Sequence, residues 1–288
     1  MTALTAVGVG EAAQLACLLE VSAAKPGNVS PGRHFHDTRY EDFLASAVAI
    51  GPAMAGAASE SGALGATVLG RTVLAAVEAT ARWTRANTNL GIILLFAPLA
   101  RAGGRRDQLR RVLRDSTVDD ARDVYRAIRL ARPGGLGAAA AQDVAGEPTV
   151  TLREAMVLAA ARDGVAREYA SDFATTFEVT APALARARGD GLSWDDAIVE
   201  TYVGLLALEA DTHIVRKQGP AVAAAVTAQA ARAMAAGGVR TESGRQALAE
   251  FDTVLRGYPH NGANPGTTAD LTAAALFVSV MHGGWDAR

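Results

Sequence analysis

The chain has 288 residues, of which half are hydrophobic, and 28 Lys and Arg against 30 Asp and Glu give a formal net charge of −2. Such a chain can bury a full core, which excludes wholesale disorder, and its near-zero charge argues against general binding to nucleic acid or anionic membranes. The single cysteine, Cys17, excludes an internal disulfide framework and a multi-cysteine zinc site.

No segment has the features of a membrane anchor or a signal peptide. The longest apolar runs, 90–100 and 271–281, fall well short of the roughly 20 residues that cross a bilayer. The N-terminal stretch lacks a basic region, and Glu11 and Glu20 interrupt it. We therefore expect a cytoplasmic protein that acts on small molecules, with no nucleic-acid or membrane partner. The sequence leaves open whether the chain forms homo-oligomers.

Helical periodicity dominates the chain. Apolar residues recur at helical spacing, as at Leu69, Val73 and Val77, and alanine fills much of the rest. The only short strand candidate is 149–152. The sequence predicts helices over 9–22, 40–60, 63–82, 89–102, 105–114, 118–131, 151–178, 193–209, 219–236, 243–257 and 266–282.

These elements predict an all-α fold, a single multi-helix domain over residues 1–288. The Gly- and Pro-rich stretch 132–150 is the longest break between helices. It is predicted to be a lid over the site or a weak domain boundary. The motifs described below lie on both sides of it, which favours one domain whose site is formed by interhelix loops and helix N-termini.

Lysine and asparagine are rare and clustered. The chain has 26 Arg but only two Lys and five Asn, and all seven lie within 25–38, 84–91, 211–219 and 260–270. Arg and Lys differ most where a compact point charge is needed, so positions that keep Lys indicate specific chemistry. Asparagine also favours turns, which explains the Asn positions without a ligand.

The first segment contains Lys25-Pro26-Gly27-Asn28 and, further along, Asp37. Pro26 keeps the preceding residue out of the helical conformation, and Gly27 permits a ligand to approach the backbone closely. Lys25 could meet phosphate oxygens, and Asp37 could hold a metal or act as a base. A surface loop with a solvated lysine explains the same residues.

The second segment, Asn87-Thr88-Asn89-Leu90-Gly91, precedes the apolar run 92–96. A helix needs only one Asn or Thr as its N-cap. Three small polar side chains therefore predict that at least one of them, Asn87, Thr88 or Asn89, faces a ligand.

The third segment places Asp211 before the adjacent cations Arg216 and Lys217, with Gly219 following. An acid that faces Mg²⁺ and cations that face phosphates fit a metal–triphosphate site. A solvated helix end accounts for the cations equally well.

The fourth segment is Asn264-Pro265-Gly266-Thr267-Thr268-Ala269-Asp270. Asn264 suits the N-cap of a helix, and Pro265 suits the first helical position. Free backbone amides at such a start, with the hydroxyls of Thr267 and Thr268, would bind an anion. Capping without a ligand explains every residue type present.

Taken in order, the motifs resemble the triphosphoribosyl-dephospho-CoA synthase family over residues 8–282. The resemblance implies an all-α fold, ATP as substrate, Mg²⁺, and transfer of the triphosphoribosyl group of ATP to dephospho-CoA with release of adenine. The matching residues are Glu20, Lys25-Pro26-Gly27, Val29 and Asp37; Asn87-Thr88 and Gly91; Asp211-Thr212, Arg216 and Gly219; and Asn264, Pro265-Gly266 and Ala269-Asp270-Leu271.

For that reaction we expect residues in four roles. Lys25, Arg216 and Lys217 would hold the phosphates, with Gly27, Asn264, Gly266, Thr267 and Thr268 around them. Asp211 and Asp270 would hold the metal, and Asp37 would be the base for the attacking hydroxyl. Asn28, Asn87 and Asn89, beside Thr88, would contact ribose or base.

The sequence departs from the family in two segments. The family's Asn-Thr-His-Lys-Gly is Asn87-Thr88-Asn89-Leu90-Gly91 here, and its Ser-Pro-Gly-Gly-Ser-Ala-Asp is Asn264-Pro265-Gly266-Thr267-Thr268-Ala269-Asp270. Such changes are typical of a branch in methanogens and methylotrophs associated with tetrahydromethanopterin-dependent one-carbon metabolism. Two alternatives therefore stay open. One is a related ribosyl-phosphate or phosphate transferase that acts on a pterin-type cofactor precursor. The other is a non-catalytic nucleotide-binding assembly protein.

Overall fold

The computed structural model describes residues 4–59, 69–259 and 262–285. These residues form fourteen α-helices, one π-helix and one short 3-10 helix, and no strand among them. The predicted all-α fold is confirmed. The strand candidate 149–152 was wrong, because Thr151 is the N-cap of a helix and accepts a hydrogen bond from the backbone N–H of Glu154.

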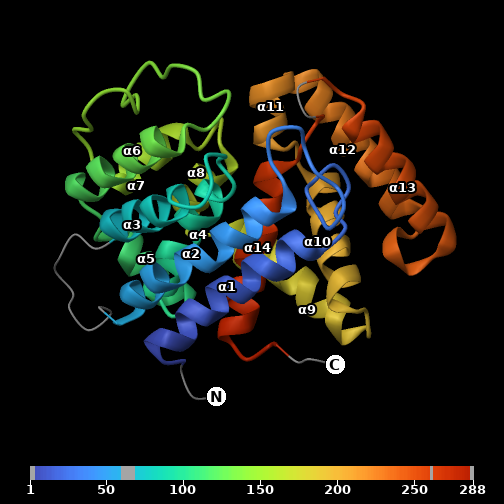
Figure 1. The fold of residues 1–288 in the computed structure, drawn as a ribbon, viewed down its shortest axis with the longest axis horizontal. Coiled ribbons are helices and arrows are strands. Elements are labelled where there is room, and N and C mark those ends of the chain that lie inside the picture. The colour runs from blue at the N-terminus through green and yellow to red at the C-terminus, as the bar shows by residue number, and fades with distance from the viewer. Residues whose placement is uncertain (1–3, 60–68, 260–261, 286–288) are drawn as a thin grey trace.

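Two groups of helices flank a central pair (Figure 1). The left group contains α2 (Tyr40–Ser59), α3 (Leu69–Ala81), α4 (Leu90–Arg101), α5 (Arg106–Arg114), α6 (Val118–Ala131), α7 (Leu152–Ala159) and α8 (Gly164–Ala170). The right group contains α9 (Ala181–Gly189), α10 (Trp194–Leu208), α11 (Thr212–Gln218), α12 (Pro220–Ala235) and α13 (Glu242–Arg256), with a π-helix (Thr175–Thr180) before α9 and a 3-10 helix (Gly238–Arg240) before α13. The pair is α1 (Ala6–Ser22) and α14 (Gly266–Met281).

The boundaries differ from prediction where polar side chains interrupt an apolar pattern. The predicted helix 151–178 is broken because Asp163 caps α8 and because Asp172 and Phe173 have positive φ angles of 53° and 58°. Helices α9 and α11 were not predicted; α11 has only seven residues and depends on its cap. The predicted start of the helix over 63–82 lies outside the described residues, which resume at residue 69.

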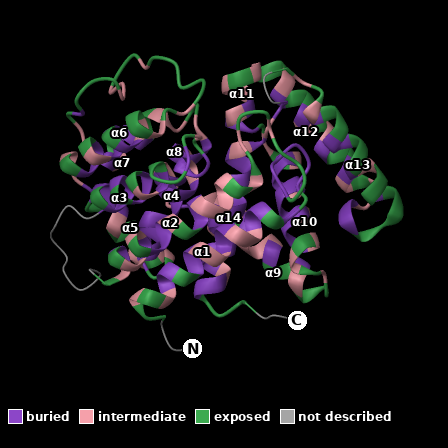
Figure 2. Ribbon diagram, viewed as in Figure 1, coloured by how far each residue is buried: buried purple, intermediate pink, exposed green. Residues whose placement is uncertain are grey.

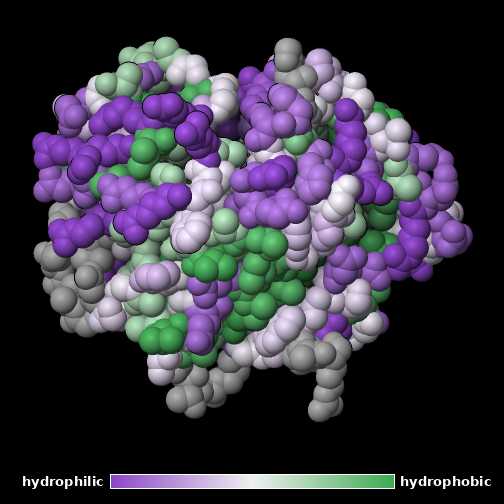
Figure 3. Space-filling model, in the orientation of Figure 1, coloured by the Kyte–Doolittle hydropathy of each residue, from purple (hydrophilic) through white to green (hydrophobic). Residues whose placement is uncertain are grey.

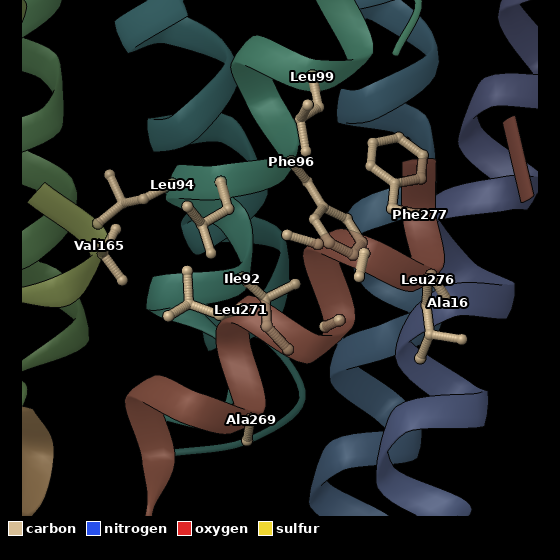
Figure 4. Packing of buried hydrophobic residues seen from close by; sticks show 14 of the residues in the cluster. Ala16, Ile92, Leu94, Phe96, Leu99, Val165, Ala269, Leu271, Leu276 and Phe277 are labelled. Carbon is tan, nitrogen blue, oxygen red and sulfur yellow. The ribbon is translucent and has the colours of Figure 1, made fainter. Parts of the chain in front are cut away.

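The centre of the fold is the contact between α4 and α14 (Figure 4). Both helices are buried on nearly all sides, as expected for helices without a polar face, and Figure 2 shows the same burial along α14. Phe96 and Phe277 stack with ring centroids 4.3 Å apart. Because the pair is enclosed by other helices, the starts of α4 and α14 are held rigidly inside the molecule.

Two prolines inside helices leave carbonyl groups that other helices satisfy. Proline has no N–H, so the carbonyl four residues earlier loses its helical partner. In α4, Pro98 frees the carbonyl of Leu94, which accepts a hydrogen bond from the hydroxyl of Tyr169 at 2.6 Å. In α2, Pro52 plays the same part, and the freed carbonyl of residue 48 accepts from Gln14 of α1 at 2.7 Å.

Helix α2 is the one helix among the described residues that is long and apolar enough to cross a membrane by length and composition. The sequence analysis had singled out other, shorter apolar runs. In the fold, α2 packs against α1, α3 and α4 through residues such as Ile50 and Met54. Figure 3 shows a hydrophobic patch in the lower middle of the view. Val7 of α1 and Val48 of α2 are among the exposed large hydrophobic side chains.

Candidate active site

A cavity of about 300 Å³ lies between the left helix group and α11. Its walls come from the turn after α1, the starts of α4, α11 and α14, helices α6 to α8, and the stretch 133–144. All four segments singled out in the sequence contribute to the lining, for example through Asn28, Asn87, Arg216 and Asn264. The fold therefore brings together distant positions, such as Asn28 and Asn264, which are 236 residues apart in the chain.

The carboxylate of Asp270 lies where the starts of α4 and α14 meet. A Cβ on Gly91 would be 2.0 Å from Oδ2 of Asp270, so only glycine lets the carboxylate rest against the first turn of α4. Burial first, and then the charges of Glu20 and other nearby carboxylates, raise the pKa of Asp270 well above its usual range. No hydrogen bond or ion pair from the described residues offsets this cost, which marks Asp270 as a group that awaits a ligand.

Beside Asp270, Glu20 lines the cavity and forms a buried ion pair with Lys25. Lys25 follows the end of α1 and turns back, so that Nζ lies 3.1 Å from Oε1 of Glu20 and 3.2 Å from the carbonyl of Ala23. It also donates to the backbone carbonyl of Glu20. The two carbonyls accept hydrogen bonds from the ammonium group, and Oε1 of Glu20 lies at ion-pair distance without a hydrogen-bond partner. Lys25 therefore does not face the cavity, as predicted for a phosphate ligand, but holds the Glu20 carboxylate in place.

Burial raises the pKa of Glu20, and the charge of Lys25 and its hydrogen bond lower it. The lysine thus opposes protonation of a carboxyl group that is 2% exposed. The rarity of lysine in this chain has a structural reason here, because a compact ammonium fits a buried site that a guanidinium fork would not.

The turn with Gly27 and Asn28 is anchored to α13. The backbone N–H of Gly27 donates to Asp252 at 2.8 Å, and Arg256 donates to the carbonyl of Asn28 at 2.6 Å. Gly27 faces α13 and not the cavity, so its predicted contact with a cofactor is replaced by a packing role. Asn28 does line the cavity, and its amide donates to Asn264 at 3.2 Å.

The side chains of the second segment line the cavity, and each also bonds to the protein. Oδ1 of Asn87 caps the first N–H of α4 at 3.2 Å. Thr88 shares a hydrogen bond of 2.5 Å with Ser46 of α2, and Asn89 donates to Thr80 of α3 at 3.2 Å. These bonds fix the start of α4 against α2 and α3. The exposed amide nitrogen of Asn87 makes no hydrogen bond with the described residues, so it is the donor of this segment that a substrate could meet.

Asp211 is a cap and not a free metal ligand. Its Oδ1 accepts from the backbone N–H groups of His213 and Ile214 at 2.8 and 3.0 Å. Its Oδ2 accepts from the N–H and the hydroxyl of Thr268 at 2.7 and 2.8 Å. With both oxygens occupied and no contact with the cavity, Asp211 joins α11 to α14, which replaces the predicted metal-binding role. Thr268 is likewise structural.

The start of α14 differs slightly from prediction. The N-cap is Pro265 and not Asn264, and it makes no side-chain cap. Thr267 lines the cavity, but its hydroxyl shares a hydrogen bond of 3.0 Å with Thr212. Gly266 lines the cavity where a Cβ would be 2.7 Å from Nδ1 of His213, so the glycine makes room for that ring.

Helix α11 presents His213 and Arg216 to the cavity. Arg216 donates to Asp163 at 2.6 Å, and its Nε is buried without a hydrogen-bond partner. Asp163 and Arg162 also line the cavity. Lys217 does not line the cavity. Its side chain is exposed, and its stem lies near Gly134 of the stretch over the cavity, away from the predicted phosphate contact.

Asp37, the predicted base, is exposed on the loop before α2 and does not line the cavity. It accepts a hydrogen bond from the neighbouring Thr38 at 3.1 Å. A carboxylate in this position cannot reach a hydroxyl held inside the cavity. The structure therefore removes Asp37 from the catalytic role.

The opposite end of the cavity is apolar. It is lined by side chains of α6, α7 and the stretch 133–144, among them Val124, Ile128, Leu136, Val144 and Met156. Leu90, from the start of α4, adds to the apolar surface. The cavity thus has a polar end with carboxylates and an apolar end of the kind that buries a ring or an alkyl chain.

The acidic, basic and histidine lining residues that were absent from the predicted site are Glu20, Asp163, Arg162 and His213. Three of them belong to helices or helix caps with an ordinary surface pattern, so periodicity alone does not distinguish them. Glu20 and His213 lie next to predicted residues, and a search of the flanking titratable groups would have found them.

Three comparisons agree on the relatives of this chain. The family model described as ATP:dephospho-CoA triphosphoribosyl transferase matches residues 6–288. A crystal structure from Archaeoglobus fulgidus, named as a triphosphoribosyl-dephospho-CoA synthase, has a TM-score of 0.63 and 29% sequence identity, and the match covers 83% of this chain and 99% of that one.

Curated relatives match over shorter stretches. A probable 2-(5''-triphosphoribosyl)-3'-dephosphocoenzyme-A synthase of Pseudomonas putida is 36% identical over 40% of this chain and 40% of that protein. A Klebsiella pneumoniae protein with the same synthase name is 28% identical over 69% of this chain and 62% of its own length. The chain thus spans less than two thirds of these curated relatives.

Proposed function

The chain belongs to the ATP:dephospho-CoA triphosphoribosyl transferase family, and from this premise we propose that it transfers the triphosphoribosyl group of ATP to dephospho-CoA and releases adenine. One observation carries the proposal: residues from all four motif segments meet in a single cavity that has carboxylates at one end and an apolar wall at the other. Such a cavity suits a donor that is charged at one end and carries a ring.

The proposed reaction forms a bond between a ribose hydroxyl of the acceptor and C1′ of ATP, and it breaks the bond between C1′ and adenine. Positive charge develops at C1′ as adenine leaves, and a nearby carboxylate stabilises it. We assign this role to Glu20, which faces the cavity and is held in position by Lys25.

Magnesium fits the donor set at the polar end. Among the described residues no group of three or more His, Cys, Asp or Glu side chains is placed to hold a metal ion. Mg²⁺ commonly takes one or two carboxylates and completes its shell with water and substrate phosphates. Asp270 offers such a carboxylate, since no described residue pairs with it. The ion would supply positive charge to the triphosphate.

The charges of the cavity also favour a divalent ion. The lining contains three carboxylates, Glu20, Asp163 and Asp270, and two guanidinium groups, Arg162 and Arg216. The positive charge of two arginines does not neutralise a triphosphate when three carboxylates lie beside it. The unpartnered Nε of Arg216 suits a phosphate oxygen, because orphaned buried donors are often completed by a ligand.

The test is a turnover assay with purified protein, ATP, Mg²⁺ and dephospho-CoA, in which adenine and the coupled product are followed by chromatography and mass. We expect adenine and a matching adduct, and neither without dephospho-CoA. Arg216→Ala should weaken binding of Mg·ATP, whereas Arg167→Ala, which breaks a similar ion pair with Glu209 away from the cavity, should not. Failure to release adenine by protein that binds Mg·ATP would overturn the proposed acceptor.

The apolar end supports a second candidate, in which the same donor reacts with a different acceptor. Leu90 and its apolar neighbours offer few polar partners to the acceptor. A pterin-type precursor presents a flat ring to such a wall. Adenine release with that class of acceptor, and none with dephospho-CoA, would decide for this alternative; no turnover with either would point to a non-catalytic nucleotide-binding protein.

A further inference from the structure

His213 is placed at the polar end of the cavity by three contacts. It is the second residue of α11, after the Asp211 cap and Thr212, and its backbone N–H donates to that cap at 2.8 Å. Its ring lies against Gly266, where any side chain would collide with it. Nδ1 lies 3.0 Å from the backbone carbonyl of Asn264. The ring is therefore held by two elements, α11 and the start of α14.

The contact with Asn264 determines which ring nitrogen carries the proton. A carbonyl oxygen can only accept, so Nδ1 must donate, and in a neutral ring Nε2 then has a free lone pair. Nε2 accepts no hydrogen bond from the described residues. Burial, followed by the charges of Lys217 and Arg216, lowers the pKa of His213 to about 4, and the Asn264 carbonyl and Asp163 act in the opposite direction. The imidazole is thus neutral near pH 7.

From this geometry we propose that Nε2 of His213 accepts the proton of the attacking hydroxyl. This inference rests on the proposed transfer reaction. The acceptor oxygen bonds to C1′, the bond from C1′ to N9 of adenine breaks, and its electron pair leaves with adenine, which takes a proton from water. The hydroxyl proton passes to Nε2 and then to solvent.

A weakly basic imidazole is adequate for this step. When the hydroxyl oxygen bonds to an electron-deficient C1′, its proton becomes strongly acidic, so the acceptor of that proton needs the right position more than high basicity.

The other candidate bases have other roles, are occupied or lie outside the cavity. Glu20 is held by Lys25 and is assigned to the charge at C1′, and Asp270 is assigned to the metal ion. Asp37 lies outside the cavity, and Asp163 is committed to Arg216 and to the cap of α8. Asp211 accepts four hydrogen bonds. In His213, Nδ1 is already used to fix the orientation of the ring, and Nε2 is left to accept a proton. An arrangement that orients an imidazole through Nδ1 and leaves Nε2 free is how histidine bases are commonly held.

The variant His213→Asn separates catalysis from structure. The Asn amide can occupy the place of Nδ1 and keep the bond to the Asn264 carbonyl, but nothing replaces Nε2. We expect kcat to fall by about 10²–10⁴-fold, the range for loss of a positioned base, with Mg·ATP affinity and Tm close to the wild type. Gln218→Ala is the matched control on α11, since it loses a 2.7 Å hydrogen bond to the carbonyl of Pro259 away from the cavity.

Rescue provides an independent readout if His213→Asn folds poorly. In His213→Ala, added 1-methylimidazole can accept a proton but cannot donate to Asn264, so restored turnover would identify the acceptor function of the ring. A kcat within about threefold of wild type in a folded His213→Asn protein, or no rescue of His213→Ala, would overturn the role of His213 and leave the proposed function standing. Absence of adenine release by the wild type would overturn the proposed function, and this inference with it.

Discussion

The polar and apolar ends of the cavity are supported in different ways. At the polar end, the functional side chains stand on the starts of α4, α11 and α14 and on the turn after α1. The buried Asp211 joins α11 to α14, and the buried Asp252 holds the turn at Gly27. At the apolar end, part of the wall is the stretch 133–144, which has no regular helix and is tied to α6 by two side-chain bonds, from Tyr125 and Arg129.

This contrast suggests a division of work. Chemistry at C1′ requires precise placement, which rigid helix starts provide. Recognition of an acceptor tolerates change in an irregular segment more readily than in a buried helix start. We therefore expect substitutions at the polar end to change kcat or stability, and substitutions at the apolar end to change KM.

The largest expected effect is at the buried ion pair of the polar end. Lys25→Met removes the charge that compensates Glu20, and breaking a buried pair typically costs about 3–5 kcal/mol. We expect a loss of that order in the free energy of unfolding, measured by urea denaturation. The double variant Glu20→Gln/Lys25→Met should recover much of the stability but not the activity. If the single variant is as stable as the wild type, Lys25 does not support Glu20 as described.

Asp270→Asn should separate activity from stability. Removing a group that stabilises charge in the reaction typically lowers kcat by about 10²–10³-fold. Stability should rise, because burial and nearby acids oppose the charge of Asp270. Steady-state kinetics and thermal unfolding measure the two effects. A variant with lower stability as well as lower activity would show that Asp270 is needed for packing instead.

The pH dependence of stability tests the environment of His213. Its pKa in the folded protein is about 4 against 6.5 for an ordinary histidine, so the unfolded chain binds the extra proton first as the pH falls. The contribution is complete above pH 6.5 and is lost between pH 6.5 and about 4; it amounts to at most about 3 kcal/mol. The carboxyl groups with raised pKa act in the opposite direction.

The difference between wild type and His213→Asn isolates this contribution from that of the acids. Unfolding free energies measured from pH 4 to 7 should be similar for the two proteins above pH 6.5, and below that pH the wild type should lose stability relative to His213→Asn. Parallel curves would mean that the ring is not buried as neutral imidazole.

The sequence predicted the all-α fold because periodicity and alanine content act locally, and it located the four segments because their composition is unusual. It did not predict the direction of side chains. Lys25 and Asp211 look like ligands in the sequence, yet each is used up by backbone groups that only the fold brings near. Asp37 shares a loop with Asn28, but the turn between them leaves one outside and one inside the cavity.

His213 shows the opposite case. A single histidine in a short unpredicted helix has only its nearness to Asp211 and Arg216 as a sequence signal, and its importance comes from the Asn264 carbonyl, 51 residues away, which sets its tautomer. Short helices that depend on one cap are also the elements that periodicity finds least well.

The smallest expected effect is at the apolar end. Tyr125→Phe removes the 2.6 Å hydrogen bond to the carbonyl of Gln142 and loosens the stretch 133–144 without changing the polar end. One such bond contributes about 1 kcal/mol, which corresponds to roughly a fivefold rise in KM for the acceptor with kcat unchanged. Tyr40→Phe, which loses a 2.9 Å contact with Ser22 outside the cavity, is the control. A fall in kcat at constant KM would place this segment in the chemistry, and the division between the two ends would no longer hold.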